Sequence, residues 1–234
     1  MDSQEDPGAM RKPGLKPLRS SSFKKQYLIL YNFVNAILWL TVLGRVLLLI
    51  PLVGLGRVYP GVGRFTKWTQ TLAVLEVVHA ATGTSPILNS QVLQQSANNF
   101  LPRSLASRLL LVWGIIFQFP FLAKSAGYSS MLIAWSVTEV VRYSYFVFTL
   151  SGYSPGLISW LRYNTFYVLY PLGISSECWL IYTTIKPAKE KRQVYAWILQ
   201  LILLVYIPGS YILFTHMMAQ RRKLMRAKQI QKAE

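Results

Sequence analysis

Long apolar segments recur along almost the whole chain, and this recurrence restricts the folds that are open to it. Most of the segments reach or exceed the about 20 residues that a helix needs to cross a hydrocarbon core ~30 Å thick. Buried helices of a soluble protein rarely show such runs throughout a chain, so we expect an all-α, polytopic membrane protein. The predicted bundle has six transmembrane helices, at residues 27–50, 68–86, 107–123, 129–151, 158–185 and 194–217. The second and third are shorter, and a tilted hairpin or a re-entrant pair is the alternative there.

The regions that flank these segments are polar. Residues 1–25 are rich in Pro, Ser and charge and are predicted to be a disordered leader, whereas residues 219–234 form a basic tail. Residues 26–218 between them are predicted to be one membrane domain. The first apolar segment exceeds the about 7–15 residues of a signal-peptide core, so we expect it to be a retained span. A single cysteine excludes an internal disulfide framework.

The distribution of basic residues predicts the orientation of the bundle. The net charge is +17, with 25 Lys and Arg against 8 Asp and Glu. Most of the basic residues outside the spans fall on the side of the two termini, which favours both termini in the cytosol. The predicted loop 186–192, "KPAKEKR", opposes this orientation. The tail is expected to touch anionic lipid headgroups, and it lacks the interleaved aromatic residues that would indicate nucleic-acid binding.

Three acidic residues, Glu76, Glu139 and Glu177, fall inside apolar segments. A carboxylate at the bilayer centre costs at least ~2.5 kcal/mol on insertion scales, so each should face the bundle interior and have a partner or a function. His79 lies three residues after Glu76, and Arg142 lies three after Glu139, so each pair shares a helical face. We interpret Glu139 and Arg142 as a structural ion pair. For the first pair, a structural contact and a substrate-orienting histidine both remain open.

Glu177 differs because no Lys, Arg or His lies within four residues of it. A desolvated carboxyl group without a cation can exchange a proton near neutral pH, as a general acid or base must. Tyr170 lies seven residues earlier, on the same helical face but about 10.5 Å away along the axis. Pro171 and Gly173 predict a kink or a short unwound stretch that brings both side chains to one pocket. The alternative is an ordinary packed tyrosine at an ordinary proline kink.

The block "RYNTFYVLYPLGISSE" (162–177) resembles the signature of the very-long-chain (3R)-3-hydroxyacyl-CoA dehydratases, also called protein-tyrosine-phosphatase-like proteins. Three further stretches resemble other blocks of that family in the same order: "LEVVHAATG" (75–83), "RLLLVWGI" (108–115) and "WSVTEVVRYSYF" (135–146). The resemblance extends from about residue 27 to residue 216. The connection 89–106 is longer than the usual link in the family, which bears on the substrate entrance.

This resemblance implies a six-span enzyme of the endoplasmic reticulum membrane with both termini cytosolic. Its reaction is the third step of fatty-acid elongation, in which a long-chain 3-hydroxyacyl-CoA loses water and becomes a trans-2-enoyl-CoA. The implied catalytic residues are Tyr170 and Glu177, and the implied partners are the other enzymes of the elongation cycle. Candidate substrate-binding residues, for the thioester or the CoA phosphates, are Arg142, Tyr143, Arg162, Glu76 and His79.

The chemistry of such a dehydration suits a carboxyl group and a phenol. A base removes the C2 proton, which the thioester carbonyl acidifies, and an acid protonates the departing C3 hydroxyl. The reaction therefore needs neither a redox cofactor nor a metal. Which of Tyr170 and Glu177 is the acid and which the base stays open at this point. An apolar bundle also offers room for a long acyl chain.

Other activities fit the residues less well. A cysteine phosphatase needs Cys-x5-Arg, but the position that follows Cys178 at this spacing is Thr184. With only two histidines, the chain lacks the clusters of a condensing elongase, a desaturase or a metal site. "YTTIK" (182–186) matches a ketoreductase motif without a nucleotide-binding unit. The remaining alternatives are a non-catalytic membrane scaffold of the same family and a proton-coupled transporter, which the lack of an internal repeat disfavours.

Overall fold

The computed structural model of the chain describes residues 22–81, 105–153 and 155–233, and every regular element in these ranges is helical. The expected all-α class is therefore confirmed for the described residues. The elements are α1 (Ser22–Val53), α2 (Tyr59–Leu72), α3 (Val74–Ala81), the π-helix η2 (Leu110–Ile116), the 3-10 helix η3 (Pro120–Ala123), α5 (Ala126–Ser151), α6 (Gly156–Asn164), α7 (Phe166–Lys191) and α8 (Gln193–Ala233). Nearly all of the predicted leader and of the 89–106 connection lies outside the described residues.

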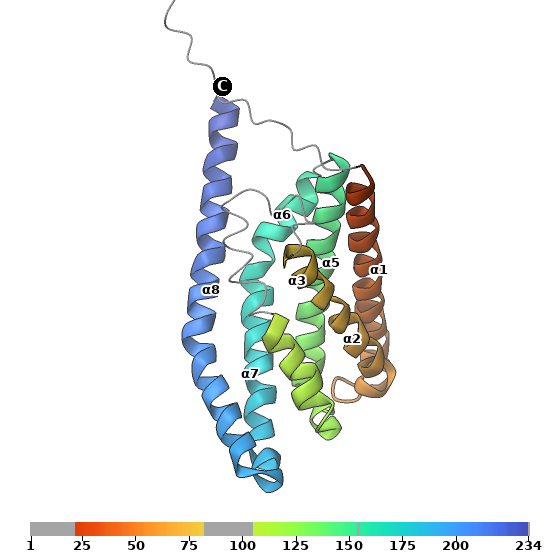
Figure 1. The fold of residues 1–234 in the computed structure, drawn as a ribbon, viewed down its shortest axis with the longest axis vertical. Helices are drawn as coiled ribbons and strands as arrows, with labels where there is room; N and C mark the ends of the chain where they lie inside the picture. Colours follow the sequence, from red (N-terminus) through yellow and green to blue (C-terminus); the bar gives the residue numbers. More distant parts are fainter. Residues whose placement is uncertain (1–21, 82–104, 154, 234) are drawn as a thin grey trace, which may run out of the picture.

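The helices run alternately up and down one bundle axis (Figure 1). The chain descends through α1, returns through α2 and α3, descends through the helical segment Leu105–Ile116, and rises again through α5. It then descends through α6 and α7 and rises through α8, so that α1 begins at the end of the bundle where α8 ends (Figure 1). α5 packs against α1 and α7, and α7 packs against α8.

The outer helices α1 and α8 are apolar and exposed. Residues Phe23–Val53 and Gln193–Ala219 are long and apolar enough to cross a membrane, yet only 17% and 6% of their most apolar stretches are buried. The core helix of a soluble protein would be mostly buried, whereas helices that expose an apolar surface of this extent suit contact with lipid. The helix Leu105–Ile116 is apolar but shorter. By length and composition, two of the six predicted spans therefore qualify among the described residues.

Three predicted boundaries were wrong. The segment 68–86 is divided, since α2 ends at Leu72 and α3 begins at Val74. The segment 158–185 is divided at Thr165, between α6 and α7. The predicted loop 186–192 is helical as far as Lys191, because Lys, Glu and Ala are strong helix formers and basic residues in a last turn are favoured by the helix dipole. Charge in that stretch marks an exposed helix end rather than a loop.

Candidate active site

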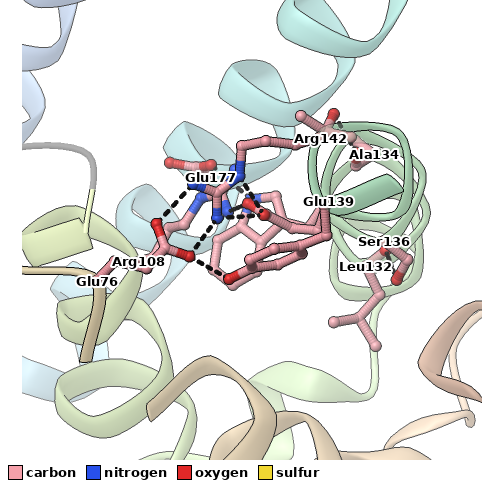
Figure 2. A network of polar contacts seen from close by, with 11 residues as sticks. Glu76, Arg108, Leu132, Ala134, Ser136, Glu139, Arg142 and Glu177 are labelled. Atoms are coloured by element: carbon pink, nitrogen blue, oxygen red, sulfur yellow. Dashed lines mark hydrogen bonds and ion pairs between the residues drawn. The ribbon is translucent and has the colours of Figure 1, made fainter. Parts of the chain in front are cut away.

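Arg142 of α5 lies at the centre of a buried polar cluster (Figure 2). Its Nη1 and Nη2 donate to the two carboxylate oxygens of Glu76 on α3, at 2.7 and 2.9 Å. Its Nε donates to Oε2 of Glu139 at 2.7 Å. Arg108, from the helical segment Leu105–Ile116, donates to the other oxygen of Glu139, and the hydroxyl of Tyr143 donates to Glu76. Acid and base thus alternate along the row Glu76, Arg142, Glu139, Arg108, and the four formal charges cancel.

The cluster confirms one predicted pair and gives the glutamate of the other pair a partner on α5. Glu139 and Arg142 form the expected ion pair within α5. Glu76 binds α5 through both carboxylate oxygens, because a guanidinium can donate to both at once. The ring of His79 shares a hydrogen bond of 3.0 Å with the hydroxyl of Tyr27 on α1. This hydrogen bond ties α3 to α1.

Glu177 on α7 is also buried, but its hydrogen-bond partners differ from those of Glu76 and Glu139. Its carboxyl group is buried, with 8% of the residue exposed. Nε1 of Trp135 donates to Oε1 at 2.8 Å, and the hydroxyl of Tyr206 on α8 donates to Oε2 at 2.9 Å. Among the described residues no ion pair to Glu177 is found, and Arg108 lies over the ring of Trp135, 5.0 Å from its centre. Glu177 is therefore the one acid of the cluster whose direct partners are neutral.

Tyr170 lies on the same side of α7 as Glu177, facing α8. Its hydroxyl donates to the backbone oxygen of Ser210 at 2.7 Å, and its ring lies 5.8 Å from that of Phe214. Ser210 follows Tyr206, the partner of Glu177, by four residues, which is about 6 Å along a helix. Tyr170 and Glu177 thus contact neighbouring turns of α8.

The two side chains meet α8 without an unwound backbone, so that part of the prediction was wrong. α7 runs continuously through Pro171 and Gly173. The break lies earlier, at Thr165, and α7 continues through Pro171 although the proline supplies no amide donor. Gly173 is buried against α5, where an added Cβ would lie 3.7 Å from that of Ala134. This glycine serves close helix packing rather than unwinding.

The remaining predicted site residues divide into two groups. Arg142, Tyr143 and Glu76 belong to the cluster, whereas Arg162 on α6 packs against the rings of Tyr145, Phe146 and Tyr163 at 4.5, 5.2 and 5.9 Å. A cavity in the described part of the molecule is lined by Tyr59, Arg64, Lys67, Phe117, Tyr128 and Met131 among others. Neither Tyr170 nor Glu177 lines it, so it does not supply the apolar room that we expected beside them. No set of three metal-ligating side chains occurs within the described ranges.

Sequence reasoning missed Trp135, Tyr206 and Arg108. A buried indole N–H needs an acceptor, but nothing local pairs Trp135 with Glu177, which lies 42 residues away. Tyr206 and Arg108 lie 29 and 31 residues from the acids that they bind, on other helices, and nothing local marks them.

Known proteins resemble this chain over most of its length. The family model described as "Protein tyrosine phosphatase-like protein, PTPLA" matches residues 70–227. A Schizosaccharomyces pombe protein named "Probable very-long-chain (3R)-3-hydroxyacyl-CoA dehydratase" is 38% identical over 88% of this chain and 95% of its own length. "Very-long-chain (3R)-3-hydroxyacyl-CoA dehydratase PASTICCINO 2B" of Oryza sativa subsp. japonica is 36% identical, with the same coverage of each chain. "Very-long-chain (3R)-3-hydroxyacyl-CoA dehydratase 2" of Homo sapiens is 31% identical over 85% of this chain and 80% of its own.

No solved structure was found to match the chain. The family match and the relatives, which cover most of the chain, agree with one another. The chain therefore belongs to the protein tyrosine phosphatase-like (PTPLA) family.

Proposed function

We propose that this chain is a very-long-chain (3R)-3-hydroxyacyl-CoA dehydratase, a hydro-lyase that converts its acyl-CoA substrate into a trans-2-enoyl-CoA. The names of relatives that match nearly full length support this activity. The structural observation that carries it is Glu177, a buried carboxyl group with two neutral donors, beside Tyr170 on the face of α7 that meets α8. A cysteine phosphatase is disfavoured, because Cys178 is followed by helix where a phosphate-binding loop would be needed.

In the proposed reaction, Glu177 is the base and Tyr170 is the acid. The carboxylate of Glu177 takes the C2 proton, the electron pair of that bond forms the C2=C3 double bond, and the C3–O bond breaks. The hydroxyl of Tyr170 gives its proton to the leaving oxygen, which departs as water. The proton on Glu177 then returns to the phenolate of Tyr170. The contacts support this assignment, because Trp135 and Tyr206 both donate to Glu177 and so favour the carboxylate, whereas Tyr170 is itself a donor.

The paired charges have a different proposed role. All three guanidinium nitrogens of Arg142 already donate to Glu76 or Glu139. We therefore assign Arg142 and Tyr143 to fixing α3 against α5 rather than to binding phosphates. Arg108 links this row to the catalytic carboxyl group through Trp135. The row thereby fixes the orientation of the indole that holds Glu177.

We place the enzyme in the endoplasmic reticulum membrane with six spans and both termini cytosolic. The alternating helix path and the common end reached by α1 and α8 support an even number of crossings (Figure 1). We retain residues 26–218 as the membrane domain, with the leader and the basic tail in the cytosol. Because the substrate and the product are intermediates of a chain-elongation cycle, the proposed partners are the condensing enzyme and the two reductases of that cycle.

The test is dehydration of a long-chain 3-hydroxyacyl-CoA by the purified full-length protein. Tyr170→Phe and Glu177→Gln keep the size of each side chain, and each should lower kcat by about 10²-fold or more. Near-normal turnover by Glu177→Gln would show the proposed base to be wrong. Absence of turnover in the wild type, with the protein folded, would favour the non-catalytic scaffold.

A further inference from the structure

Arg221 joins α8 to the start of α7 near the end of the bundle where the chain finishes. Its Nη1 donates to the hydroxyl of Tyr167 at 3.3 Å and its Nη2 to Oδ1 of Asn164 at 3.1 Å. Its guanidinium lies 5.3 Å from the centre of the Tyr167 ring. Its Nε is buried and has no hydrogen-bond partner in the described structure. Two neutral oxygens and an aromatic face therefore hold this cation in place.

Arg221 differs in this from the two arginines of the paired row, Arg108 and Arg142. Arg108 and Arg142 each bind glutamates, which cancel their charge. A guanidinium has five N–H donors in a fixed plane, and among the described residues Arg221 directs two of them to hydrogen-bond acceptors. Both acceptors, the Tyr167 hydroxyl and the Asn164 amide oxygen, are uncharged. A fixed, incompletely satisfied guanidinium is well suited to bind a phosphate, which accepts two parallel hydrogen bonds.

A strip of aromatic side chains connects Arg221 to the proposed catalytic tyrosine. The ring of Phe214 lies 5.8 Å from the ring of Tyr170 and 6.3 Å from the ring of Tyr167. The guanidinium of Arg221 lies over the ring of Tyr167. Arg221 follows Ser210, the hydrogen-bond partner of Tyr170, by eleven residues, or about 16 Å along α8. The extended pantetheine arm of CoA, which separates a thioester from the diphosphate, has a comparable length. The cation thus lies at a suitable distance from the reacting carbons.

We propose that Arg221 binds a phosphate of the CoA part of the substrate, with the pantetheine arm lying along the seam of α7 and α8 over Phe214. This inference rests on the proposed dehydratase function. Arg221 lies just beyond Ala219, where the apolar stretch of α8 ends, so the nucleotide can remain hydrated while the acyl carbons reach Tyr170 and Glu177. The uncharged arm crosses the aromatic strip, where a charged group would be poorly solvated.

The experiment compares two substrates with the same 3-hydroxyacyl group, one a CoA thioester and the other a pantetheine thioester that lacks the diphosphate and the nucleotide. Arg221→Gln should raise KM for the CoA thioester by about 10-fold or more, with kcat little changed, because a charge-assisted contact is lost. The KM for the pantetheine thioester should match that of the wild type. Arg222→Gln removes the same charge from the exposed neighbouring residue and should leave both KM values unchanged.

Each other outcome would overturn the proposal. An equal rise of KM for both substrates would mean that Arg221 only fixes α8 on α7. A rise that depends on the anionic lipid content of the vesicles would assign Arg221 to a lipid phosphate. Unchanged kinetics would exclude a contact.

If the wild type turned over neither substrate, the proposed dehydratase activity would be refuted, but the proposed phosphate site would not. Direct binding of free CoA would then test whether Arg221 binds a phosphate. Weaker binding of CoA by Arg221→Gln than by Arg222→Gln would still support it, whereas equal binding would refute it.

Discussion

Two regions of this bundle bury glutamates in opposite ways. Between α3 and α5, Glu76 and Glu139 are each bound by arginine, and the row of four charges cancels. Between α7 and α8, Glu177 has only an indole N–H and a phenol as direct partners. A buried charge without its counter-charge is unstable, so the first region depends on its pairs remaining intact. The second region leaves a carboxyl group that can accept and release a proton, which is what catalysis needs.

The largest effect on stability should come from breaking the paired row. Arg142→Met leaves the carboxylates of Glu76 and Glu139 buried without their shared cation, and removal of one partner of a buried pair costs about 3–5 kcal/mol. We expect a large fall of Tm in detergent, measured by thermal unfolding. Arg142→Lys should recover only part of the loss, because an ammonium cannot bind both glutamates in the geometry of a guanidinium. A Tm of Arg142→Met close to that of the wild type would mean that the row contributes little.

A smaller effect should follow from removing one donor to the unpaired carboxyl group. Tyr206→Phe keeps the ring but loses the hydroxyl that binds Oε2 of Glu177, and we expect kcat to fall about 10-fold. The lost hydrogen bond favoured the charged carboxylate, so Glu177 should take up a proton more readily in the variant. The acid limb of the profile of kcat against pH should therefore move to higher pH. A lower kcat with an unmoved limb would give Tyr206 a purely structural role.

The smallest effect should come from the glycine at the contact of α5 and α7. Gly173→Ala adds a Cβ that meets Ala134 at an ordinary contact distance of 3.7 Å, and alanine favours a helix over glycine by about 1 kcal/mol. We expect Tm to hold or to rise slightly. Gly63→Ala is the contrasting variant, because its Cβ would overlap the ring of Tyr59 and should lower Tm. A marked fall of Tm for Gly173→Ala would argue that α7 is irregular at this point.

What the sequence revealed depended on how local each interaction is. The pair of Glu139 and Arg142 lies within one turn, so spacing alone predicted it. Glu177 stood out because its neighbourhood lacks cations. Its partners did not stand out, since Trp135 and Tyr206 lie 42 and 29 residues away and reach it only through helix packing.

The backbone of α7 departed from the prediction in two places. Pro171 and Gly173 indicated a distortion of the helix. The break lies instead at Thr165, where the chain has neither a proline nor a glycine. A proline marks a place where helix bonds are weak, and the surrounding packing decides where the chain bends. The charged stretch 186–192 indicated a loop, yet it is helical as far as Lys191, because its Lys, Glu and Ala residues are strong helix formers. The apolar patterning, in contrast, predicted the helical class correctly.

The most direct test of the contrast between paired and unpaired acids compares Glu177→Gln with Glu139→Gln in the same purified preparation, by turnover of a 3-hydroxyacyl-CoA and by Tm. Glu177→Gln should lose turnover by about 10²-fold or more at a nearly unchanged Tm. Glu139→Gln should lower Tm substantially, because it removes the charge shared by Arg108 and Arg142, while turnover per folded molecule stays within about 10-fold of the wild type. If Glu177→Gln instead turned over normally, or if Glu139→Gln abolished turnover at an unchanged Tm, the assignment of chemistry to the unpaired acid would be contradicted.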